Sequence, residues 1–223
     1  MVLGNVKRSD VQTFQRWSRW IRIATHVAAL LPLAFLALAY ARGDFVDPIR
    51  TITLRTGRTA ILLLTLSLAC TPVEIVTGFR AVMAARKPLG LYAALYAIIH
   101  FAIFAAWDYG LQLDLLWYEL RDRPFIQVGT LALLALIPLA VTSTRRWMRR
   151  LGKNWKRLHW LAYAAGLLAT AHYLLTVKAD RRLPWTYATI LVVTLALRVP
   201  VIRRTIEKTR KRATSGHSNA QTS

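Results

Sequence analysis

The sequence predicts an all-α integral membrane protein, a bundle of six transmembrane helices with N- and C-termini in the cytoplasm. The prediction depends on six long apolar runs and on the uneven distribution of positive charge between them. Hydrophobic residues make up 55% of the 223 residues, a composition typical of membrane proteins. Each run is close to the ~20 residues that a membrane-spanning helix needs. The runs are residues 20–40, 57–77, 89–109, 125–143, 157–177 and 184–202.

The positive charge predicts the orientation of these helices. Of the 31 Lys and Arg residues, 22 lie on segments that would share the side of the N-terminus, and 9 lie on the opposite side. Because cytoplasmic segments carry an excess of Lys and Arg, we expect a multi-pass protein of the bacterial inner membrane with both termini inside. The net charge of +21 therefore favours a membrane protein over a nucleic-acid-binding one, since the charge lies between apolar runs.

The segments between the runs are too short to fold independently, so we expect one membrane domain over residues 20–204. A basic cytoplasmic N-terminus, residues 1–19, would precede it. A basic tail, residues 205–223, would follow and be disordered, because its end is small and polar. The single cysteine, Cys70, excludes an internal disulfide and a cysteine-based metal site. The sequence shows no glycine-rich phosphate loop and no evident internal repeat.

Four histidines lie inside or at the edge of apolar runs: His26, His100, His159 and His172. An ionisable side chain in the membrane is costly and normally has a partner. For a neutral imidazole in an apolar bundle the suitable partner is a metal, and most simply haem iron. The chain is therefore predicted to be a haem-binding electron-transfer protein. The alternative is a small transporter or scaffold, in which each imidazole is only hydrogen-bonded to a neighbouring hydroxyl or carbonyl.

Depth along the runs predicts how the histidines pair. Counted from the cytoplasmic end of each run, His159 lies about 3 Å deep, His26 about 9 Å, His100 about 16 Å and His172 about 22 Å. By depth, His100 and His172 would hold an outer haem, and His26 would join His159 at an inner one. His159 and His172 are roughly 140° apart around their helix, so they address different sides of it.

The fifth run and the segment before it resemble a known family. The motif is Leu151-Gly-x-x-Trp155-x-x-Leu158-His159-x-Leu161-x-Tyr163, followed by His172 and Lys178-Ala-Asp180. Supporting segments are Thr71-Pro72, Leu89-Gly90-Leu91-Tyr92 before His100, and Arg123-Pro124-Phe125-Ile126 with Gly129. Over residues 57–180 the chain resembles the MsrQ (YedZ) family, the haem-binding membrane subunits of the MsrPQ protein-methionine-sulfoxide reductase systems, within the ferric-reductase-like transmembrane group.

The resemblance implies a specific function. Family members pass electrons from the quinone pool or a cytosolic flavin reductase, through b-type haem, to a periplasmic molybdopterin enzyme. That MsrP-like partner reduces methionine sulfoxide in oxidised periplasmic proteins, so the catalytic site would lie on the partner. The family's haem ligands correspond to His100, His159 and His172, which implies one or two haems, with His26 as a candidate fourth ligand. FMN is also associated with the family, without any residue here assigned to it. The alternative is a haem-containing ferric or quinone oxidoreductase with another acceptor.

Overall fold

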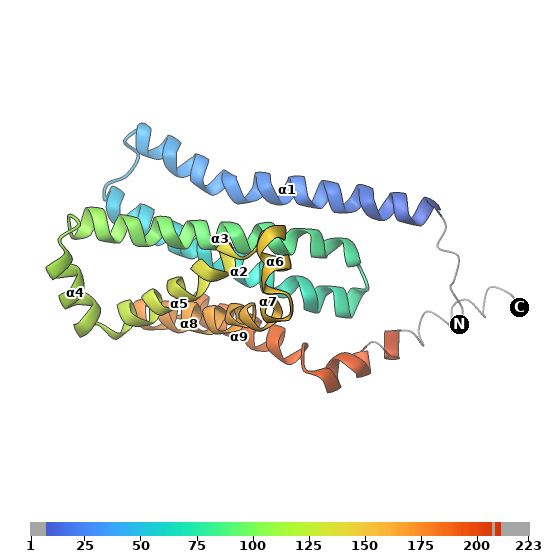
Figure 1. The fold of residues 1–223 in the computed structure, drawn as a ribbon. Helices are drawn as coiled ribbons and strands as arrows, with labels where there is room; N and C mark the ends of the chain where they lie inside the picture. The colour runs from blue at the N-terminus through green and yellow to red at the C-terminus, as the bar shows by residue number, and fades with distance from the viewer. Residues whose placement is uncertain (1–7, 207, 211–223) are drawn as a thin grey trace, which may run out of the picture.

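The computed structural model describes residues 8–206 and 208–210, and every regular element in these residues is helical (Figure 1). The prediction of an all-α protein is therefore confirmed for the described part of the chain. The elements are α1 (Arg8–Ala41), α2 (Pro48–Thr77), η1 (Arg80–Val82), α3 (Met83–Ile103), the π-helical η2 (Phe104–Asp108), α4 (Leu113–Asp122), α5 (Pro124–Val141), α6 (Arg145–Leu151), α7 (Lys153–Leu158), α8 (Leu161–Thr176) and α9 (Arg182–Ala196).

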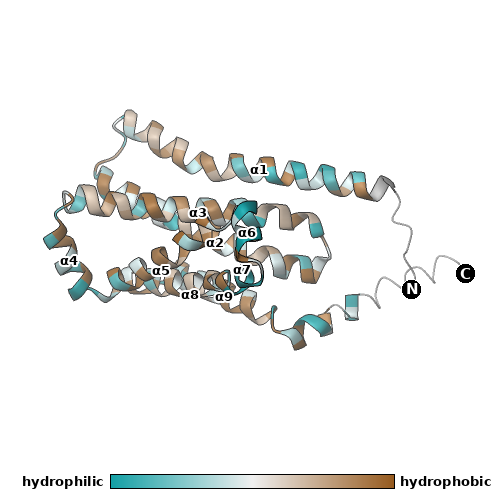
Figure 2. Cartoon of the chain, viewed as in Figure 1, coloured by the Kyte–Doolittle hydropathy of each residue, from teal (hydrophilic) through white to brown (hydrophobic). Residues whose placement is uncertain are grey.

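Four helical segments within the described ranges are long and apolar enough to cross a membrane. They are Val11–Ala41, Pro48–Thr77, Arg80–Asp108 and Pro124–Val141. Helix α9 and the following Pro200–Arg210, bent by 79°, would together make a fifth. The predicted run 157–177 contains α8, which has 16 residues. Figure 2 shows apolar residues along α3 and hydrophilic residues at α6 and along the N-terminal half of α1.

Helix α2 begins at Pro48, earlier than the predicted start at residue 57. Asp47 caps the helix, because its side chain accepts a hydrogen bond from the backbone N–H of Arg50 at 3.0 Å. Pro48 occupies the first turn, where its missing N–H costs nothing. Arg50 and Arg55, which precede the predicted run, therefore lie on the first turns of this helix.

The two ends of the bundle also differ from the predicted boundaries. Helix α1 runs from Arg8 to Ala41, so it continues through residue 19, where the basic N-terminal segment was expected to end. In the tail predicted to be disordered, Thr205, Ile206 and residues 208–210 are helical. The rest of that tail lies outside the described residues.

Close helix packing depends on small residues. Ala93 of α3 and Ala165 of α8 are both fully buried, at 0% exposure. At Gly166 an added Cβ would lie 2.9 Å from Leu68, so glycine lets α8 approach α2 closely. Tyr96 of α3 is buried and donates a hydrogen bond to the carbonyl of Ala29 at 2.8 Å, which ties α1 to the bundle.

A proline inside α2 is compensated by an arginine from the end of the chain. Pro72 has no N–H, so it cannot donate to the carbonyl of Leu68 four residues earlier. Arg198, just after α9, supplies the missing donor through Nη2. Its Nη1 donates to the Tyr163 hydroxyl at 2.6 Å. The guanidinium therefore joins α2, α8 and the last helical segment.

Replacing Arg198 with alanine should destabilise the protein, because the buried Leu68 carbonyl then loses its donor. An unsatisfied buried acceptor costs about 1–3 kcal/mol, which should appear as a lower thermal unfolding midpoint in detergent. Pro72→Ala restores an N–H four residues after Leu68. In the double variant, part of the loss caused by Arg198→Ala should therefore be recovered. Additive effects of the two substitutions would contradict this account, and Tyr163→Phe isolates the contribution of the Nη1 bond.

Candidate functional site

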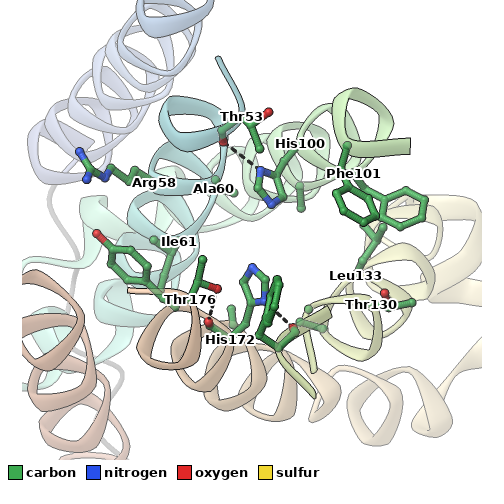
Figure 3. Close-up of a pocket in the computed structure, with 18 of the residues that line it drawn as sticks. Thr53, Arg58, Ala60, Ile61, His100, Phe101, Thr130, Leu133, His172 and Thr176 are labelled. Atoms are coloured by element: carbon green, nitrogen blue, oxygen red, sulfur yellow. Dashed lines mark hydrogen bonds between the residues drawn. The ribbon is translucent and has the colours of Figure 1, made fainter. Parts of the chain in front are cut away.

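A cavity with a volume of about 240 Å³ lies between α2, α3, α5 and α8. Its walls are mostly aliphatic and aromatic, from helices of both the first and the second half of the chain (Figure 3). His100 and His172 are the histidines that line it, and Arg58 is its one charged lining side chain among the described residues. An apolar cavity with a few convergent polar groups is the usual form of a cofactor site.

His100 of α3 and His172 of α8 face each other across this cavity. Their ring centroids are 6.2 Å apart, with the ring planes at 75°. Figure 3 shows the two imidazoles pointing toward one another from opposite walls. Depth along the predicted runs had suggested this pairing, and the structure places the two rings together.

Each of these two imidazoles is oriented by a backbone carbonyl. Nδ1 of His100 lies 2.9 Å from the carbonyl of Thr53, and Nδ1 of His172 lies 2.7 Å from the carbonyl of Phe125. A carbonyl can only accept, so Nδ1 must carry the proton and donate it. In the neutral form of each ring Nε2 is then unprotonated and can bind a metal. A histidine ligand whose other nitrogen donates to a carbonyl is the usual arrangement at metal sites.

A glycine lies against each imidazole. A Cβ at Gly57 would lie 3.1 Å from Nδ1 and Cε1 of His100. A Cβ at Gly129 would lie 2.7 Å from Nδ1 and 2.9 Å from Cε1 of His172. No real Cβ approaches so closely at Gly129, so that imidazole keeps its position only because the residue is glycine.

The two walls of the cavity are an internal repeat. The first wall contains Thr53, whose carbonyl orients the imidazole, together with Gly57 and His100. Adding 72 to each residue number gives Phe125, Gly129 and His172, which have the same roles on the second wall. The same offset relates Leu54, Ala60, Ile61, Leu64, Ala97, Phe101 and Phe104 to Ile126, Ala132, Leu133, Leu136, Ala169, Tyr173 and Thr176, all of which line the cavity. The expectation of no internal repeat is therefore wrong: helices α2 and α3 correspond to α5 and α8.

His159 and His26 lie outside this cavity. The ring of His159 stacks on Trp155, with centroids 3.9 Å apart, and its Nδ1 lies 3.1 Å from the Trp155 carbonyl. His26 is exposed on α1, and its Nδ1 lies 3.0 Å from the Tyr92 hydroxyl. No ring contact joins His26 to His159 in the part of the chain that the structure describes. The repeat offset relates His159 to Lys87, which cannot supply an equivalent imidazole.

The cavity and its two histidines suit haem, in which a flat apolar macrocycle surrounds the metal, better than a bare metal ion. No cluster of three or more His, Cys, Asp or Glu side chains that could hold a metal ion occurs within residues 8–206 and 208–210, whereas a bare ion such as zinc takes about four ligands. Two opposed imidazole nitrogens could both bind a haem iron, and the apolar walls would suit its macrocycle. Gly57 and Gly129 leave room for the imidazoles of His100 and His172 in their present positions.

Comparison with known proteins agrees with this geometry. A family model described as "Ferric reductase like transmembrane component" matches residues 56–170, which include Gly57, His100 and Gly129. A protein of Xanthomonas axonopodis pv. citri, named protein-methionine-sulfoxide reductase heme-binding subunit MsrQ, is 44% identical over 181 residues, covering 78% of this chain and 83% of the relative. The chain belongs to the MsrQ family. An MsrQ of Rhodospirillum rubrum is 41% identical over 186 residues, covering 82% of this chain and 89% of that relative.

The MsrQ resemblance predicted from the sequence is thus confirmed, as is membership of a transmembrane family. Sequence reasoning singled out His100 and His172 but missed the groups that hold them: Gly57, Gly129 and the two carbonyls. A signal for these groups was available, because a glycine lies 43 positions before each of the two histidines. Comparing the sequence with itself at an offset of 72 finds it.

Proposed function

We propose that this protein is the membrane electron-transfer subunit of a protein-methionine-sulfoxide reductase, with one b-type haem held by His100 and His172. The observation that supports this most directly is the opposed imidazole pair, each ring with Nδ1 on a carbonyl and Nε2 available. The chemistry that haem supplies is the reversible uptake of one electron, at a potential set by its ligands and surroundings.

The chain's own residues position and insulate this site. The carbonyls of Thr53 and Phe125 fix the imidazole tautomers and increase the basicity of Nε2. The mostly aliphatic and aromatic walls would limit the access of water to the site. In this proposal His159 and His26 take other roles, because their rings contact Trp155 and Tyr92.

We also propose six membrane spans, with α8 and α9 completing the bundle and both termini in the cytoplasm of the bacterial inner membrane. The excess of Lys and Arg on the N-terminal side supports this orientation. Electrons would enter from the quinone pool or a cytosolic flavin reductase and leave to a periplasmic molybdopterin reductase of the MsrP type. The names of the relatives support the reductase partner.

The test is a reduced-minus-oxidised visible spectrum of the full chain in detergent, with haem counted per polypeptide by pyridine haemochrome. We expect a b-type spectrum with one haem per chain. The reduced protein should then be re-oxidised by an MsrP-type reductase only when a methionine sulfoxide peptide is present. Equal re-oxidation by ferric citrate or a quinone alone would favour a ferric or quinone oxidoreductase. If the protein is expressed with ample haem and is still colourless, the haem proposal is rejected and the alternative of a transporter or scaffold is favoured.

A further inference from the structure

The repeat makes the two walls of the cavity equivalent, yet its two rims differ in polarity. The rims lie on either side of the line that joins the two histidines. One, here called the polar rim, consists of Arg58 from α2 with Tyr173 and Thr176 from α8. Figure 3 shows Arg58 and Thr176 on this side of the histidine pair.

The opposite rim, here called the aromatic rim, is formed by the residues that the 72-residue offset relates to the polar rim. They are Thr130 from α5, Phe101 from α3 and Phe104 from η2. Figure 3 shows Phe101 and Thr130 on this side. At all three pairs of related positions, the more polar residue is on the polar rim. The two rims therefore differ at these three pairs, although the histidines and glycines on the two walls are the same.

Arg58 is the one charged group of either rim, and it forms no ion pair within the described residues. The Arg58 side chain is exposed in the isolated chain, and a cation on a membrane-spanning helix requires a counter-charge or water. Haem carries both of its carboxylates on one edge, and its opposite edge is apolar. The planar guanidinium of arginine matches a carboxylate and forms strong, charge-assisted hydrogen bonds with it.

We propose that Arg58 binds the haem carboxylates and that the polar rim thereby sets the orientation of the haem between two equivalent histidines. This inference depends on the proposed haem site. Since the ligands, carbonyls and glycines are duplicated, they hold the iron but do not distinguish one edge of the disc from the other. Arg58, the charged member of the polar rim, makes that distinction, and Phe101 and Phe104 would accept the apolar edge.

The repeat supplies an unusually direct test, because Thr130 is the position equivalent to Arg58. Three variants of the full chain are compared in detergent: Arg58→Thr, the exchange Arg58→Thr with Thr130→Arg, and the control Arg55→Thr. Arg55 lies on the same helix one turn earlier, with its guanidinium 5.6 Å from the Phe45 ring centroid and outside the cavity. The readouts are the haem reduction potential and the carboxylate bands of the redox-difference infrared spectrum.

In Arg58→Thr the potential should shift to more negative values, because an unpaired carboxylate opposes the addition of an electron. The carboxylate bands should shift as well. In the exchange variant the haem should turn by half a revolution toward the new arginine, so that both readouts return toward the wild type. Arg55→Thr should match the wild type in both readouts.

Two outcomes would overturn this inference while leaving the haem site intact. One is a wild-type spectrum and potential in Arg58→Thr. The other is an exchange variant that remains as shifted as the single variant. A wild-type protein without haem would instead reject the proposed function, and this inference with it. Lack of folding in a variant is excluded by its helical circular dichroism and by the haem it retains.

Discussion

Replacing His172 with alanine is expected to remove haem from the purified protein. The substitution takes away one of two opposed imidazoles whose rings lie 6.2 Å apart, and among the described residues His100 is then the one imidazole left in the cavity lining. The b-type spectrum should be lost, or reduced to that of a weakly held five-coordinate haem. Because the repeat makes the two histidines equivalent, His100→Ala should have the same effect. The measurement is the haem content per chain by pyridine haemochrome.

His26→Ala is the matched control for this loss. His26 is also a histidine on an apolar helix, but its ring is exposed and contacts Tyr92 rather than the cavity. Its replacement should leave the haem content and the spectrum unchanged. Full haem content in His172→Ala, with unchanged helical circular dichroism, would show that this residue is not a ligand. Loss of haem in His26→Ala would restore His26 as a candidate ligand.

Gly129→Ala should weaken haem binding without touching a ligand. The new Cβ would lie 2.7 Å from Nδ1 of His172, so the imidazole must move away from the Phe125 carbonyl that orients it. Overpacking of this kind costs about 1–3 kcal/mol, and 1.4 kcal/mol corresponds to about tenfold in affinity. The haem dissociation constant should therefore rise roughly tenfold or more, measured by haem titration into the apoprotein or by transfer to apomyoglobin.

The other helical glycines provide a graded comparison. Gly57→Ala should have a smaller effect, because its Cβ would lie 3.1 Å from the His100 ring. Gly90→Ala on α3 would meet only the hydroxyl of Ser67, at 3.2 Å and outside the cavity, so haem affinity should be unchanged. If Gly129→Ala and Gly90→Ala have the same haem affinity, the close contact between residue 129 and the His172 imidazole does not explain why glycine is needed at position 129.

The helices could be predicted from the sequence because their apolar runs are long, but their ends could not. Helix α2 starts at Pro48 because Asp47 caps it, and this local contact precedes the apolar run that defined the prediction. Helix α3 likewise starts at Met83, before residue 89. Depths counted from the run starts separated His100 from His172 by several ångströms, whereas the structure places the two rings opposite each other.

The site could be predicted only as far as its histidines. An imidazole inside an apolar run stands out in a sequence, whereas a carbonyl such as that of Thr53 carries no sequence signal at all. Gly57 and Gly129 are visible as letters, but their role depends on the approach of another helix. The compensation of Pro72 by Arg198 is equally hidden, because the two residues are far apart in the chain and meet only through packing.

The 72-residue relation also has a consequence for how the site is made. Each half of the chain carries one histidine, one orienting carbonyl and one glycine, as each subunit of a twofold dimer would. The half with His100 precedes the half with His172 in the chain. The proposed haem site would therefore be complete only after the helix with His172 has been inserted. Binding of haem by both histidines would follow that insertion.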